Sequence, residues 1–266
     1  MRIVRFSVNN KDASYGILQN LEISPIEGDI FGNWRRTASN LKLENVRLLA
    51  PIPPPNILAI GLNYKAHAKE SGQPIPPAPV LFIKANTALT DPNQPIILPS
   101  IAPNEVDYEA ELVIIIRKLA RNVSENEAHN YVLGYTCGND VSARDCQLRL
   151  DAQWARGKSF DTFAPMGPWI ETELQADTSR IRCRLNGRTM QDSNTKDLIF
   201  NTSQLISYLS KCMTLVPGTA IMTGTPSGVG FARKPPVFLK AGDVVEVEID
   251  GIGTLQNPVK QETKTY

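Results

Sequence analysis

The run from Leu112 to Ile116 constrains the fold of this chain more than any other segment, because five consecutive apolar residues require burial. Four of the five are β-branched, and β-branched residues favour strands because their side chains pack well on a pleated surface. We therefore predict a buried strand here rather than a surface helix.

Three acidic residues precede this run at alternate positions, namely Asp107, Glu109 and Glu111. Side chains in a strand alternate between its two faces, so we expect these carboxylates to project from one face and to converge. Ionised carboxylates beside an apolar layer lose hydration and repel each other, and a divalent cation would relieve both costs. Hard cations such as Mg²⁺ and Ca²⁺ prefer oxygen ligands. The spacing alone leaves a second interpretation open, in which the acids lie at the solvated end of the strand.

The composition excludes several classes of partner and site. With 42% hydrophobic residues and a net charge of +1, the chain offers no electrostatic case for nucleic acid or for an acidic membrane surface, and we expect neither partner. No apolar run approaches the roughly 18 residues of a spanning helix, and the N-terminus lacks the features of a signal peptide, so we expect a cytoplasmic protein. The four cysteines are scattered without a CxxC pair, and the chain has only two histidines, which favours an oxygen-ligated metal over zinc.

The chain divides at a proline-rich segment. Residues 1–50 contain strand-like pieces at 2–6 and 15–18, which predict a small N-terminal β-rich module. The stiff sequence APIPPP at residues 50–55 marks a boundary, and residues 51–266 form the predicted main domain. Further elements follow in this domain, with strands predicted at 57–60, 80–83, 134–139 and 219–222 and a helix at 202–213.

Two further ionisable residues extend the candidate site. Asp140 directly follows the strand predicted at 134–139, and Ser142 is placed to cap a helix that begins near Ala143. Lys158 lies among aromatic residues in a loop punctuated by glycine and proline, where a lysine suits stabilisation of an enolate or a carboxylate. The alternative for Lys158 is a surface lysine whose ammonium group reaches solvent.

A histidine and a glutamate lie one helical turn apart in the segment bounded by Gly61 and Gly72. His67 and Glu70 would share one face of a short helix, which suggests a general base with its orienting acid. The alternative is a solvated surface turn. Later in the chain, the glycines and hydroxyls of TGTPSGVG at residues 223–230 would suit backbone N–H contacts to a carboxylate.

Five motifs in this order, GLNYKAHAKESG, VDYEAEL, NDVSARDCQ, GKSFDTFAPMGP and TGTPSGVG, resemble those of the fumarylacetoacetate hydrolase family. The resemblance covers roughly residues 50–260, and the stretch RKPPVFLKAGD is most similar to the subgroup of fumarylacetoacetate hydrolase domain-containing protein 2. The resemblance implies an α+β, β-rich fold with a rolled mixed sheet around the site, and the N-terminal module predicted above lies outside the motifs that carry it. The resemblance also implies a homodimer and a bound Mg²⁺ or Mn²⁺ ion, with Ca²⁺ as a possible substitute.

Carried over residue by residue, the resemblance assigns roles to specific positions. It implies metal ligands at Glu109, Glu111 and Asp140. It implies catalytic roles for Lys158 in the pocket and for His67 and Glu70 on a lid, where such a pair activates water. It implies substrate contacts from Arg144, Gln147, Gly224 and Thr225.

The resemblance implies 2-oxo or 2,4-dioxo acids as substrates. Such an acid can chelate a cation through its carboxylate and keto oxygens, and the cation then stabilises an enolate. We expect a hydrolase in which a water directed by His67 attacks C4 of an acylpyruvate and releases the enolate of pyruvate. The same site would also support two other reactions of oxaloacetate, decarboxylation and keto–enol tautomerisation. A further alternative is a catalytically silent metal-binding protein.

Overall fold

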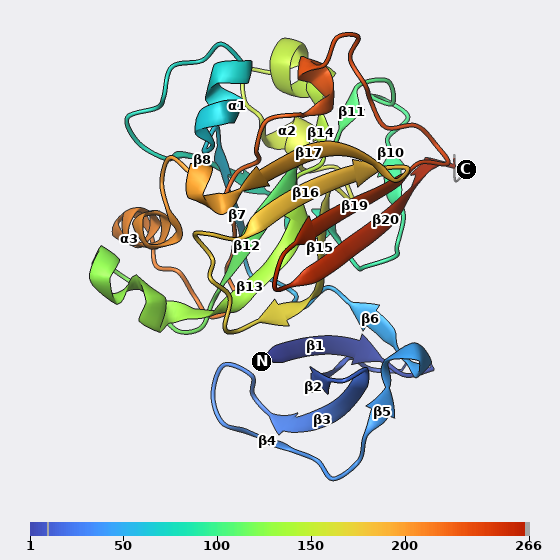
Figure 1. Ribbon diagram of the computed structural model, residues 1–266, viewed down its shortest axis with the longest axis vertical. Coiled ribbons are helices and arrows are strands. Elements are labelled where there is room, and N and C mark those ends of the chain that lie inside the picture. The colour runs from blue at the N-terminus through green and yellow to red at the C-terminus, as the bar shows by residue number, and fades with distance from the viewer. Residues whose placement is uncertain (10, 264–266) are drawn as a thin grey trace.

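The computed structural model describes residues 1–9 and 11–263 and has a β-rich α+β fold with two large sheets (Figure 1). The N-terminal strands are β1 (Arg2–Ser7), β2 (Ser14–Gln19), β3 (Glu22–Gly28), β4 (Trp34–Arg36), β5 (Leu41–Lys42) and β6 (Arg47–Leu49). The other strands of the larger sheet are β7 (Ile57–Gly61), β8 (Val80–Lys84), β9 (Leu89–Thr90), β12 (Ala110–Ile116), β13 (Val132–Asn139), β15 (Ala164–Glu171) and β18 (Ala220–Met222). The second sheet contains β10 (Ile96–Leu98), β16 (Arg180–Leu185), β17 (Arg188–Asn194), β19 (Val244–Ile249) and β20 (Gly253–Gln261), and a separate pair is formed by β11 (Val106–Asp107) and β14 (Ser142–Ala143).

The helices are short and lie around the sheets. The α-helices are α1 (Lys65–Glu70), α2 (Ala155–Lys158) and α3 (Thr202–Cys212), and the π-helical turn is η4 (Cys146–Leu150). The 3₁₀ turns are η1 (Leu43–Asn45), η2 (Asn86–Ala88), η3 (Glu125–Tyr131), η5 (Thr195–Asp197) and η6 (Gly230–Ala232). Within the described parts of the chain, no helix is long and apolar enough to cross a membrane.

The larger sheet has 13 strands and follows the order β4-β3-β2-β1-β15-β13-β12-β18-β7-β8 along its main path. It is a mixed sheet, because β18 runs parallel to β7 whereas β12 is antiparallel to both β13 and β18. The β-rich, mixed fold expected from the sequence is therefore confirmed. Its central strand in the main domain, β12, is the one that leads into the candidate site.

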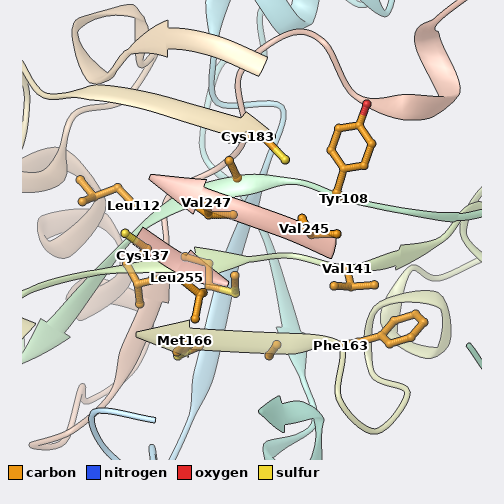
Figure 2. Packing of buried hydrophobic residues seen from close by; sticks show 14 of the residues in the cluster. Tyr108, Leu112, Cys137, Val141, Phe163, Met166, Cys183, Val245, Val247 and Leu255 are labelled. Carbon is orange, nitrogen blue, oxygen red and sulfur yellow. The ribbon is translucent and has the colours of Figure 1, made fainter. Parts of the chain in front are cut away.

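β12 contains the apolar run, and the prediction of a buried strand is confirmed. Every residue from Leu112 to Ile116 is 0% exposed. On one side lies the core shared with the second sheet, to which Val247 of β19 and Leu255 of β20 contribute (Figure 2). On the other side, a second apolar cluster includes Leu205 of α3. Because both sides are covered, the strand is continuously apolar rather than alternating.

The N-terminal strands continue the larger sheet at one end of the molecule, where Figure 1 shows them in blue. β1 pairs with β15, with Arg2 opposite Glu171 and Ile3 opposite Ile170. These strands also have a small core of their own, formed by Val4, Phe6, Leu18 and Ile23. The division into residues 1–50 and 51–266 stays a prediction, since β6 ends near the expected boundary but the sheet itself is continuous across it.

The helix predicted to begin near Ala143 is present from Arg144 onward, but Ser142 does not cap it. Ser142 and Ala143 form the short strand β14, and the Ser142 hydroxyl donates to the carbonyl oxygen of Asp140 at 2.9 Å instead of capping a helix. The π-helical turn η4 begins later, at Cys146, whose N–H donates to the Asp145 carboxylate at 2.7 Å. The capping side chain is therefore Asp145, three residues beyond the position expected from the sequence.

The position of β12 leads to a stability prediction. Replacing Leu112 by Ala should lower the free energy of unfolding by about 2–5 kcal/mol, because the substitution leaves a cavity between the sheets. Leu119→Ala is the matched control, since Leu119 is 64% exposed, and it should change the value by less than about 0.5 kcal/mol. Urea denaturation of both variants measures the difference, and equal effects would contradict the central role of β12.

Candidate active site

The pairing of β12 with β13 brings three carboxylates to one end of the sheet. Ala110 lies opposite Asn139 in this antiparallel pair, so the residue before β12 and the residue after β13 are neighbours. The N–H of Asp140 donates to the carbonyl oxygen of Glu109 at 2.9 Å. One carboxylate oxygen each from Glu109, Glu111 and Asp140 lies within 4.8 Å of the other two.

These carboxylates do not lie at a solvated strand end. Glu109 is 5% exposed, and Glu111 and Asp140 are each 1% exposed. Asp107 lies near Glu109, since both contact Nη2 of Arg144, but it is not part of the three-carboxylate cluster, and the regular strand breaks between β11, which ends at Asp107, and β12, which begins at Ala110. The strict alternation on which the expected convergence of Asp107 with Glu109 and Glu111 depended is therefore lost at this point.

Two buried lysines neutralise part of this negative charge. Lys158, at the end of α2, donates to Glu109 at 2.7 Å and to Asp140 at 2.6 Å. Burial alone would lower the pKa of Lys158, but the neighbouring Asp140 and Glu109 raise it above its usual value. Lys84, which the sequence did not single out, is fully buried and donates to the other oxygen of Asp140 at 2.5 Å. A lysine at the end of a strand carries no local signal of such burial, so Lys84 could not be identified from the sequence pattern.

Glu109 and Glu111 differ in their electrostatic surroundings. Burial raises the pKa of Glu109, but Lys158 and Arg144 more than offset this and hold the pKa well below its usual range. Glu111 has no ion pair to a cationic side chain among the described residues, and its carboxylate accepts a hydrogen bond from the N–H of Gly224 at 2.8 Å. Burial, followed by the charges of Asp140 and Glu109, raises the pKa of Glu111 well above normal. An all-oxygen cluster with one uncompensated carboxylate fits a hard divalent cation.

His67 and Glu70 form the pair expected from the sequence. They lie on one face of α1, and His67 Nδ1 is 3.2 Å from the Glu70 carboxylate. His67 is only 7% exposed, so the alternative of a solvated surface turn is wrong for this side chain. Glu70 also accepts the N–H of Gly228 at 2.9 Å, which joins α1 to the loop of residues 223–230.

The residues expected to contact substrate are also near the carboxylates. Arg144 contacts Glu109 at 2.7 Å and donates from Nη1 to Gln147 at 2.8 Å. The Thr225 hydroxyl donates to the carbonyl oxygen of Ala110 at 3.0 Å. Gln191, which the sequence did not indicate, donates to that hydroxyl at 2.8 Å and fixes the loop to β17.

Gly224 is confined to glycine by its backbone. Its φ of +100° lies in the region that side chains rarely adopt, and an added Cβ would come within 2.7 Å of the Asn63 Cβ. This conformation allows its N–H to reach Glu111. The contribution of Gly224 is therefore through its backbone.

A cavity of about 440 Å³ collects these side chains. The predicted site residues that line it are His67, Glu109, Glu111, Asp140, Arg144, Gln147, Lys158 and Thr225. Glu70 and Gly224 act from behind the lining, through His67 and Glu111. The cavity also has apolar walls, including Phe82, whose ring centre lies 5.2 Å from the Lys158 ammonium, and Trp154, which packs edge-on against Phe82. A small polar ligand in this cavity would meet carboxylates, cations and an imidazole together.

Comparison with known proteins agrees with this architecture. Residues 56–260 match the family described as "Fumarylacetoacetate (FAA) hydrolase C-terminal", and residues 1–51 match "Rv2993c-like, N-terminal". The chain is 52% identical over 233 residues to the fumarylacetoacetate hydrolase domain-containing protein 2 homolog of Dictyostelium discoideum, over 83% of this chain and 76% of that protein. It is 48% identical over 224 residues to the mitochondrial oxaloacetate tautomerase fahd2 of Xenopus laevis, over 82% of this chain and 70% of that protein.

A solved structure extends the similarity to the whole fold. Maleylpyruvate hydrolase from Sphingobium sp. SYK-6, in complex with manganese(II) ion and pyruvate, superimposes with a TM-score of 0.80. The two chains are 29% identical, and the match covers 99% of this chain and 100% of the other. The sequence, the sheet topology and the buried acidic cluster therefore agree, and the chain belongs to the fumarylacetoacetate hydrolase family.

Proposed function

We propose that this chain is an oxaloacetate tautomerase, which interconverts the keto and enol forms with a divalent cation. The observation that carries the proposal is that His67, Lys158 and three buried carboxylates face one cavity. A base, a fixed positive charge and an oxygen-donor site therefore surround the same volume. The similarity to a named oxaloacetate tautomerase favours this reaction over the others that such a site supports.

In this proposal, Glu109, Glu111 and Asp140 hold Mg²⁺ or Mn²⁺, with Ca²⁺ as a substitute. The three oxygens within 4.8 Å of one another and the uncompensated Glu111 support this assignment. When bound, the cation would supply Lewis-acid stabilisation of negative charge on the C2 oxygen of the substrate.

His67 is the proposed base. Its Nδ1 faces Glu70, which leaves Nε2 to accept a proton from C3. The C–H electron pair becomes the C2–C3 double bond, and the C2 oxygen takes up the displaced pair and then a proton. The ammonium of Lys158 stabilises the negative charge during this transfer. The atoms of substrate and product balance, because only a proton changes position.

Arg144 and Gln147 are the proposed contacts to the second carboxylate of oxaloacetate. Both are buried and line the cavity, and Nη1 of Arg144 already lies 2.8 Å from Gln147, so the two groups act as a unit. Thr225 is proposed to contact the first carboxylate, and Gly224 to hold Glu111 in position.

Hydrolysis of acylpyruvates, the reaction expected from the sequence, is the second candidate. It is supported by similarity to a maleylpyruvate hydrolase whose structure contains manganese and pyruvate. In this case His67 would direct a water at C4 instead of accepting the C3 proton. Decarboxylation of oxaloacetate would require neither a directed water nor removal of the C3 proton. The homodimer and the cytoplasmic location stay predictions.

The metal assignment predicts opposite effects of one substitution with and without cation. Mg²⁺ or Mn²⁺ should stabilise the wild type by about 2.7 kcal/mol at a concentration 100 times the Kd. Glu111→Gln should abolish this gain, yet in chelator it should melt no lower than the wild type, because it removes an unpaired buried carboxylate. Glu105→Gln is the control, since Glu105 pairs with the exposed Arg149. A cation-dependent rise in Tm that survives in Glu111→Gln would contradict the assignment.

The proposed base predicts a selective loss of activity. His67→Ala should slow tautomerisation of oxaloacetate by about 10²-fold or more, because the C3 proton loses its acceptor. His129→Ala should be without effect, since His129 is an exposed residue of η3. Decay of the enol absorbance measures tautomerisation, and pyruvate release from oxaloacetate and from acetylpyruvate reports decarboxylation and hydrolysis. Rapid pyruvate release from acetylpyruvate without faster enol decay of oxaloacetate would establish the second candidate instead.

A further inference from the structure

Asp107 is a buried acid that the proposed mechanism does not use. It is 0% exposed and lies at the end of β11. Its Oδ1 accepts the backbone N–H of Gly230 at 2.8 Å, and its Oδ2 accepts that of Phe231 at 3.0 Å. Oδ2 also accepts Nε of Arg144 at 2.9 Å and lies 2.8 Å from Nη2 of the same side chain. A single carboxylate therefore joins a loop to an arginine of the proposed substrate site.

Arg144 is enclosed by groups of this chain. Asp107 and Glu109 flank Nη2, with Glu109 at 2.7 Å, and Gln147 accepts from Nη1. The Phe231 ring lies 4.4 Å from the guanidinium carbon. The guanidinium therefore lies between two carboxylates, one of which, Glu109, is a proposed metal ligand, and Asp107 holds it through both Nε and Nη2.

The loop packs so closely against Asp107 that position 230 has no room for a side chain. A Cβ on Gly230 would come within 2.4 Å of Asp107 Oδ1 and 1.9 Å of the carbonyl oxygen of Val237. Two residues earlier in the same loop, the N–H of Gly228 donates to Glu70 on α1. The loop that Asp107 anchors is thus the one that contacts the orienting acid of the proposed base.

We propose that Asp107 is a positioning residue, which fixes Arg144 and the loop from Gly228 to Phe231 for substrate binding. The inference rests on the proposed function in one respect, the contact of Arg144 with the second carboxylate of oxaloacetate. That carboxylate does not react, so its contacts contribute to binding of the ground state and the transition state alike. Loss of Asp107 therefore acts on KM rather than on kcat.

Steady-state tautomerisation of oxaloacetate by Asp107→Asn, Arg144→Ala and the double variant tests this. Each single variant should raise KM by about tenfold or more, with kcat lowered less than about threefold. The double variant should raise KM no further than Arg144→Ala alone, because the effect of Asp107 on substrate affinity passes through Arg144, whereas its hold on the loop is measured separately by hydrogen exchange. Glu105→Gln, two residues away and paired with exposed Arg149, should leave both constants unchanged. Additive effects on KM, or an unchanged KM in Asp107→Asn, would overturn the proposal.

Hydrogen exchange separates this proposal from the proposed function. In the wild type the amides of Gly230 and Phe231 should exchange slowly, and in Asp107→Asn their protection should fall by about tenfold or more. Should the wild type fail to tautomerise oxaloacetate, the proposed function is wrong, and the exchange data still decide whether Asp107 anchors the loop. Should Asp107→Asn fail to fold, the exchange rates of the Gly230 and Phe231 amides in the wild type test the anchoring role alone. Rapid exchange of these two amides in the wild type would refute the anchoring role.

Discussion

Charge compensation within an apolar core is the interaction on which this site depends. β12 and β13 place three carboxylates where each would lose several kcal/mol of hydration if left unpaired. Two lysines and an arginine offset that cost for Glu109 and Asp140, whereas Glu111 has only a backbone N–H as its recorded partner. The residual negative charge is thus concentrated at one residue, and this makes the position selective for a cation that approaches from the cavity.

The surrounding residues divide the remaining tasks. Lys84 on the sheet and Lys158 on α2 carry fixed positive charge. Both contact Asp140, and Lys158 also contacts Glu109. The imidazole is carried by α1, outside the sheet core. Such a division explains how one scaffold can serve tautomerases and hydrolases, because the fixed charges stabilise an enolate in either case. The chemistry then depends on what the imidazole meets, a C–H bond or a water molecule.

The sequence predicted what depends on local pattern. The β-branched run identified β12, and its position identified Glu109 and Glu111 as acids entering a buried strand. It failed where tertiary contacts override the pattern. Asp107 is not part of the three-carboxylate cluster, the strand is interrupted between it and Ala110, and no residue type announces that interruption. Lys84 is buried because Asp140 lies beside it, and their 56 residues of separation carry no local signal.

The motif resemblance supplied what periodicity could not. Arg144 and Gln147 lie in the stretch for which local signals predicted a helix, and the chain there is helical, but a helix pattern does not indicate which side chains enter a distant site. The resemblance nevertheless identified both side chains as neighbours of the site, because ordered motifs record which segments meet in space. It did not distinguish between reactions, since the chain is similar both to an oxaloacetate tautomerase and to a maleylpyruvate hydrolase.

The short helix α1 gives the protein a way to exchange solutes without disturbing its charged core. It is six residues long, and its N-cap residue, Tyr64, makes no side-chain capping bond. Its recorded side-chain ties to the rest of the chain include Glu70 to the N–H of Gly228 and Asp197 to the N–H of Ala66. Breaking those two contacts would open the cavity while β12 and its neighbours remain intact. In the proposed function, departure of product and entry of substrate would then need only a local fluctuation of α1, and an ion held by the three carboxylates would stay in place from one turnover to the next.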